Sequence, residues 1–99
     1  MAVAVIPLVA VPSQTLTTML GQTPVRLRIR QRRTGLFVDV LSQDVPVIEG
    51  VKALDRTKIV RAAYRGFPGD LFFVDTQGTT DPAYDGLGTR YLLLWQKPA

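Results

Sequence analysis

The chain has 99 residues, 46% hydrophobic and 20% charged, which suits one small domain and is too apolar for a disordered segment. It contains no cysteine and no histidine, which excludes a disulfide framework, a thiolate metal site and the commonest general base. The net charge is +4, but residues 26–33 carry five arginines and the rest is almost neutral. We therefore expect a single domain, residues 1–99, with one basic strand.

The first predicted element is an edge strand in the opening stretch MAVAVIPLVAVP. Its valines favour extended backbone, and Pro7 and Pro12 interrupt it. The stretch lacks a preceding basic region and is far shorter than the roughly 20 apolar residues that cross a bilayer, so we favour a strand over a targeting segment. A second strand is predicted at 14–20, and Gly21-Gln22 then predicts a tight hairpin turn.

The stretch VRLRIRQRR, residues 25–33, predicts the next strand and is the most unusual segment of the chain. Side chains alternate between the two faces of a strand, so the arginines at even positions share one face and the aliphatic residues share the other. Such a row suits the carboxylates of a protein partner. The alternative is a small nucleic-acid-binding β-barrel, although the strand lacks aromatic residues on which bases stack. The candidate partner interface comprises Arg26, Arg28, Arg30, Arg32 and Arg33.

Several further short strands follow. Arg33-Thr34-Gly35 predicts a three-residue turn with Gly35 in the left-handed conformation. The strand at 36–42 should place Leu36, Val38 and Val40 on one face and Phe37, Asp39 and Leu41 on the other. Additional strands are predicted at 47–54 with a break at Gly50, at 70–75 and at 89–97, whereas residues 55–66 fit a loop, a short helix or a strand.

The recurring short strands and turn signals predict the fold class. We expect an all-β domain, either a small antiparallel β-sandwich or a partly open β-barrel, built from hairpins. An antiparallel hairpin with one solvated face also explains the alternation of arginine with aliphatic residues.

Evidence for a catalytic or ligand site is weak. Most of the acidic residues lie in turn segments, where aspartate bonds to the local backbone, so we favour structural roles for them. DTQGTTD at 75–81 has the alternating oxygens of a calcium loop but lacks its terminal glutamate, and no phosphate loop is present. We expect no enzymatic activity, no metal and no cofactor. The carboxylates considered are Asp39, Asp44, Glu49, Asp55, Asp70, Asp75, Asp81 and Asp85.

The last third of the chain carries the most distinctive motifs. Proline fixes φ between two glycines in GFPG, which predicts a sharp reversal. In PAYDGLG, we expect Tyr84 to pack its ring on the end of the fold with its hydroxyl bonded to a loop carbonyl, Asp85 to cap the turn, and Leu87 to enter the core. The turn-motif residues are Gly66, Pro68, Gly69, Pro82, Tyr84, Asp85, Leu87 and Gly88.

These motifs, YRGFPGDLFFVD followed by DPAYDGLGTRYLLLW, resemble the small baseplate plug proteins of tailed bacteriophages, known from cyanophage-type contractile tails. The amino-terminal strand and the hairpin LGQTPVRLRIRQRRTGLFVDVL extend the resemblance over essentially the whole chain. The sequence departs from the family pattern at three places. Leu36 or Phe37 stands where tryptophan is frequent, residues 30–32 replace aromatic and asparagine residues, and Gly86 replaces a frequent asparagine.

The resemblance implies a structural protein of the virion, at the baseplate end of the tail tube, that acts by subunit packing. Its implied partners are tube, hub and tape-measure proteins, in a ring of three or six copies set by tail symmetry. We expect no membrane partner, and we favour protein over nucleic acid. An accessory domain of a glycan-binding or hydrolytic baseplate enzyme has no site here to support it. Charge reversal at Arg28 and Arg30 is expected to block incorporation and leave the domain folded.

Overall fold

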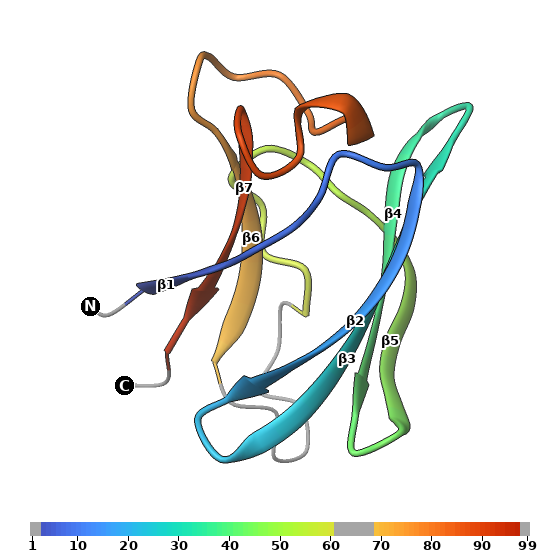
Figure 1. Ribbon diagram of the computed structural model, residues 1–99, viewed down its shortest axis with the longest axis vertical. Helices are drawn as coiled ribbons and strands as arrows, with labels where there is room; N and C mark the ends of the chain where they lie inside the picture. Colours follow the sequence, from blue (N-terminus) through green and yellow to red (C-terminus); the bar gives the residue numbers. More distant parts are fainter. Residues whose placement is uncertain (1–2, 61–68, 98–99) are drawn as a thin grey trace.

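The computed structural model describes residues 3–60 and 69–97 (Figure 1). The described part is built almost entirely of strands, and no helix within it is long and apolar enough to span a membrane. The elements are β1 (Val3–Ile6), β2 (Ser13–Leu20), β3 (Thr23–Arg32), β4 (Gly35–Ser42), β5 (Val45–Lys52), β6 (Asp70–Asp75), the single 3-10 turn η1 (Tyr84–Gly86) and β7 (Tyr91–Gln96).

The strands form two antiparallel sheets that face each other, as Figure 1 shows. One sheet has the order β2-β3-β4-β5, and the other has the order β1-β7-β6. The sheets do not close into a barrel, so the predicted all-β fold is confirmed as a small β-sandwich. The opening strand β1 lies at the edge of its sheet, as its valines and prolines predicted, and ends at the residue before Pro7.

The four-stranded sheet is a meander whose turns each contain two residues. Gly21 takes a φ of +67° in the predicted β2–β3 turn. Gln43 and Asp44 join β4 to β5 with φ of 53° and 65°, the backbone that matches strand twist in a two-residue hairpin. The turn after β3 differs from the prediction, because Gly35 pairs with Arg32 and so belongs to β4, although its φ of 144° is positive.

The core lies between the sheets and follows the predicted alternation. In β3, every second side chain from Val25 to Ile29 is buried, and the arginines between them are half-buried on the other face. The opposite sheet contributes Phe73 of β6 and Leu93 and Trp95 of β7, each at most 6% exposed. The other buried apolar residues of this core are Ile6, Leu20, Leu27, Leu36, Val38, Val40, Leu71 and Tyr91, whereas Leu41 is buried on the outer face of β4 and departs from the alternation.

The segment 53–60, for which sequence patterns left several options, runs along the free edge of β6. The Arg56 N–H donates to the Phe73 carbonyl at 2.7 Å, and the Ile59 N–H donates to the Leu71 carbonyl at 2.8 Å. Ala53, Ile59 and Val60 are buried. The segment therefore protects this edge without forming a helix, and residues 61–66 of the same prediction lie outside the described residues.

Candidate partner interface

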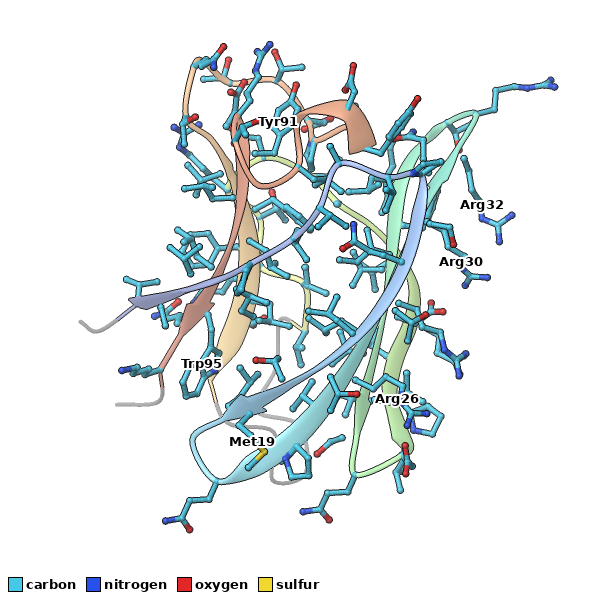
Figure 2. All side chains as sticks on the ribbon, viewed as in Figure 1. Met19, Arg26, Arg30, Arg32, Tyr91 and Trp95 are labelled. Atoms are coloured by element: carbon cyan, nitrogen blue, oxygen red, sulfur yellow. The ribbon has the colours of Figure 1, made fainter. Side chains whose placement is uncertain are left out.

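The face of the four-stranded sheet that points away from the other sheet carries the arginines of β3. We call it the basic face and define it by Arg26, Arg28, Arg30 and Arg32, with Arg33 in the adjoining turn. Arg26 and Arg30 keep 41% and 43% of their side-chain area exposed, whereas the intervening aliphatic residues are buried. Figure 2 shows Arg30 and Arg32 projecting from this outer side. The geometry expected for a period-two strand is present.

Two of these arginines already have acidic partners within the chain. An Nη atom of Arg26 lies 3.1 Å from a carboxylate oxygen of Asp44, and Arg30 Nη2 donates to Asp39 Oδ2 at 2.6 Å. The Asp44 side chain is 74% exposed, and that of Asp39 is 3% exposed. Exposed ion pairs contribute little to the free energy of unfolding, whereas a buried carboxylate requires a partner. Of these two pairs, Arg30–Asp39 is therefore the one that stabilises the fold.

Asp39 also holds an irregular part of β5. One residue of β4 faces two residues of β5 between the Val38–Val51 and Val40–Ile48 pairs, which is a β-bulge. Gly50 occupies the bulge with a φ of +67°, and its N–H donates to Asp39 Oδ1 at 2.7 Å. Sequence patterns placed Asp39 on the face opposite Leu36 and Val38 but predicted no such role for it. The available signal was one acidic residue between apolar neighbours, followed by a glycine in the next strand.

The remaining arginines are uncompensated. In the described part of the chain, Arg28, Arg32 and Arg33 have no ion pair. Arg28 stands directly opposite Asp39 in the ladder, but Arg30 and the Gly50 amide already occupy that carboxylate. On its other side Arg28 faces Thr15 of β2, which is short and neutral. The centre of the basic face therefore presents a free guanidinium on a rigid sheet, suited to a carboxylate.

The carboxylate of Asp75 organises the loop 76–90 at one end of the sandwich. Arg90 Nε donates to Oδ1 at 2.9 Å and Arg90 Nη2 donates to Oδ2 at 3.0 Å. The Gln77 and Thr80 N–H groups each donate at 2.9 Å. The Arg90 hydrogen bond is the largest cause that holds the pKa of Asp75 well below its usual range. Both oxygens are thus engaged within the chain, and no acidic cluster suited to a metal occurs in residues 3–60 and 69–97.

Part of the predicted turn architecture is found. Leu87 is 1% exposed and belongs to the core, and Pro82 is buried. Gly69 and Gly88 have φ of +74° and +84°, and a Cβ on Gly88 would lie 2.4 Å from the Leu8 carbonyl oxygen. Gly66 and Pro68 lie outside the described residues.

The predictions for Tyr84 and Asp85 are wrong in detail. Tyr84 is 37% exposed, and its link to the fold is the backbone N–H, which donates to Gln31 Oε1 at 3.0 Å. Backbone bonds close the turn, with the Leu87 N–H donating to the Tyr84 carbonyl at 3.1 Å, and no side chain caps it. The aromatic ring that is buried at this end is Tyr91 (Figure 2).

The comparison with known families decides where this fold belongs. Residues 3–98 match a family model described as "Cyanophage baseplate Pam3 plug gp18". The chain belongs to this family. No curated protein matches it.

Membership of the plug family establishes where the protein is located. The chain is a structural component of the virion, located in the tail baseplate, and it interacts with other tail components. The resemblance expected from the motifs is confirmed over nearly the full length. Within this plug, the Gln31 side chain ties β3 to the Tyr84 turn.

Proposed function

We propose that the chain closes the distal end of the tail tube by packing among neighbouring subunits, with the basic face as one of its contacts. Arg28 carries the proposal, because it is an uncompensated guanidinium at the centre of a four-stranded sheet. Burial of an unpaired charge is costly, so a subunit that covers this face must bring a carboxylate to it. Tube, hub and tape-measure proteins are the candidate partners, in a ring of three or six copies.

The opposite outer face supports a position among other subunits. On the three-stranded sheet, Val5 lies beside Leu94, and Leu94 lies beside Phe72, all on the side away from the core. Val3 and Val5 are 47% and 56% exposed. Contiguous apolar surface of this kind is uncommon on isolated proteins and typical of surfaces that bind other proteins. The two broad faces therefore have opposite chemistry, one basic and one apolar.

Nucleic acid fits the basic face less well than protein does. Asp39 and Asp44 neutralise two of its arginines, which weakens attraction for phosphate. Phe37 is the aromatic residue that the ladder places beside Arg30, and its side chain is half-buried. A binding groove for single strands requires exposed aromatic rings for stacking.

The choice of variants for a test follows from the ion pairs. Charge reversal at Arg30 would place a glutamate against the buried Asp39 carboxylate and destabilise the sheet, so the expectation that Arg28 and Arg30 can both be reversed in a folded domain is replaced. Arg28→Gln with Arg32→Gln removes uncompensated charges only, and it brings no new carboxylate beside Asp39, which stands opposite Arg28 in the ladder. Lys97→Gln, at an exposed position beyond β7 on the other sheet, is the control; its ammonium group has no ion pair in the described residues but lies 5.9 Å from the centre of the Trp95 ring, so thermal unfolding of this variant is measured as well.

We expect the Arg28→Gln/Arg32→Gln variant to fold normally and to be incorporated into particles about tenfold less than the parent, because a carboxylate of the partner then meets no cation at the interface. Thermal unfolding checks the fold, and quantitative mass spectrometry of purified particles measures incorporation. Normal incorporation would exclude the basic face from the contact. A cryo-EM map without this chain at the tube terminus would refute the location, and oligonucleotide binding at low salt would favour a nucleic-acid role.

A further inference from the structure

The four-stranded sheet has one edge that nothing in the described structure protects. β2 forms this edge and pairs with β3 alone. Its eight residues, SQTLTTML, contain no charge and no proline, and all eight pair with β3 in an unbroken register. Edge strands that are not meant to pair are normally short, charged, bulged, covered or interrupted by proline. β2 has none of these features.

The other sheet edges are protected. β5 has Pro46, two register shifts and the charged residues Glu49 and Lys52. β1 has only four residues and stops before Pro7. The free side of β6 is covered by the segment 53–60, as described above. The chain protects its three other sheet edges in three different ways, so the unprotected edge at β2 is an exception that calls for a functional explanation.

The register shows which backbone groups of β2 face outward. Residue pairs of an antiparallel ladder alternate between hydrogen-bonded and non-hydrogen-bonded types, and the pair that closes a two-residue turn, here Leu20–Thr23, is hydrogen-bonded. Two observations agree with this phase. Pro24, which has no N–H, falls opposite Met19 in a non-hydrogen-bonded pair, and the Gln31 N–H donates to the Pro12 carbonyl at 2.7 Å. The outward N–H and C=O groups therefore belong to Ser13, Thr15, Thr17 and Met19.

Side chains of these same residues lie on the basic face. Thr15 stands beside Arg28, and Thr17 stands beside Arg26. A strand added to β2 would lie about two strand spacings, roughly 10 Å, from β3. Because Thr15 is short, the long side chain of Arg28 can pass over it to reach a carboxylate on the added strand. On the core side of β2, Leu16 is only partly buried, so an apolar residue beside it would extend the core.

We propose that β2 accepts, as an added strand, an extended segment of a neighbouring baseplate protein in which acidic residues alternate with apolar ones. The inference rests on the proposed function and specifies its partner. Main-chain hydrogen bonds to Thr15 and Thr17 supply affinity, and the acidic residues select this edge through Arg28. The apolar residues of the segment cover the open side of Leu16.

The test uses the full chain and an octapeptide of alternating glutamate and valine, with a lysine–valine octapeptide as the comparison. Amide hydrogen exchange, followed by NMR, reports which backbone groups become protected. We expect the glutamate peptide to slow exchange at Thr15 and Thr17, to leave the β5 edge unchanged, and to bind more weakly as salt is raised. The lysine peptide should bind at least about tenfold more weakly.

Thr17→Pro removes one outward N–H and leaves the ladder to β3 intact, since proline is tolerated at such an edge position. Thr17→Val keeps the N–H and the β-branched shape, and serves as the matched control. Thr17→Pro should weaken peptide binding about tenfold or more, and Thr17→Val should leave it unchanged. Thermal unfolding of both variants confirms that the sandwich remains folded.

The outcomes separate this inference from the proposed function. Peptide binding without protection of β2 amides, or equal binding by Thr17→Pro, would overturn the added strand. In particles, normal incorporation of Thr17→Pro together with failed incorporation of Arg28→Gln/Arg32→Gln would reject strand addition and retain packing through the basic face. If neither variant is incorporated while the control is, the result would support both strand addition at β2 and packing through the basic face.

Discussion

Asp75 is the residue on which the order of one end of the sandwich depends. Its side chain is inaccessible to solvent, and two arginine nitrogens and two backbone amides donate to it. Asp55 adds a further tie, because its carboxylate accepts from the Asp75 N–H at 2.8 Å. Four donors around one buried carboxylate favour its charged form, although burial opposes it. The loop 76–90 is therefore held by a charge that must stay ionised.

The lowered pKa of Asp75 predicts an acid-labile contribution to stability. A carboxylate whose pKa is lower in the folded state than in the unfolded state stabilises the fold above the unfolded value, about pH 4, and loses this effect as the pH falls further. The midpoint of urea unfolding should therefore drop between about pH 5 and about pH 2. Asp75→Asn should lower the midpoint at neutral pH and flatten the acid dependence. Glu49→Gln, at an exposed position with no ion pair in the described residues, should change neither.

At the scale of the elements, two glycines with similar backbone conformations differ in what surrounds them. Gly50 in the β5 bulge has a φ of +67°, and apart from its two chain neighbours no residue has an atom within 4 Å of the place that a Cβ would take. Gly69, directly before β6, has a φ of +74°, and a Cβ there would lie 1.9 Å from the Gln96 carbonyl oxygen. Gly50 is required only for its left-handed backbone conformation, whereas Gly69 also allows β6 to approach the end of β7.

This difference gives a paired prediction. Gly50→Ala should reduce the free energy of unfolding by about 1–2 kcal/mol, the cost of a left-handed conformation for a residue with a Cβ. Gly69→Ala should cost clearly more, because Gln96 offers backbone rather than a flexible side chain and must move. Urea denaturation of both variants measures the difference. Equal losses would show that the approach of β6 to β7 relaxes without cost.

Sequence patterns predicted the strands and faces of this sheet but not its polar contacts. The alternation in β3 is a local property, so the outward row of arginines and the inward Val25 and Ile29 followed from spacing alone. The Arg30–Asp39–Gly50 contact depends on the register of three strands and on a bulge, and no local pattern encodes either. The same reason explains the missed role of Asp75, whose partner Arg90 is distant in sequence.

At the scale of the molecule, the two sheets differ in how far apart their pairing partners lie in the chain. Strands β2 to β5 follow one another through two-residue turns. By contrast, β1 pairs with β7, so that Val3 lies opposite Gln96. Closing a long loop costs more conformational entropy than closing a short turn, so the meander should form first during folding.

Matched isoleucine variants test this order. Ile29 in β3 and Ile6 in β1 are both buried, and Ile→Val at each should cost about 0.5–1.5 kcal/mol. Ile29→Val should mainly slow refolding, whereas Ile6→Val should mainly accelerate unfolding. Stopped-flow fluorescence of Trp95, which is buried between the sheets, follows both rates. Slower refolding of the Ile6→Val protein to the same degree would place β1 in the folding nucleus.

The pairing of β1 with β7 also brings the two ends of the described chain together at one side of the sandwich, as Figure 1 shows. A short peptide joining them would turn the most distant strand pair into neighbours along a circular backbone. Reopening that circle at the exposed Gly21-Gln22 turn would yield a permuted chain with the same two sheets. In such a permutant the entropy cost of closure would shift from β1 and β7 to the β2–β3 pair.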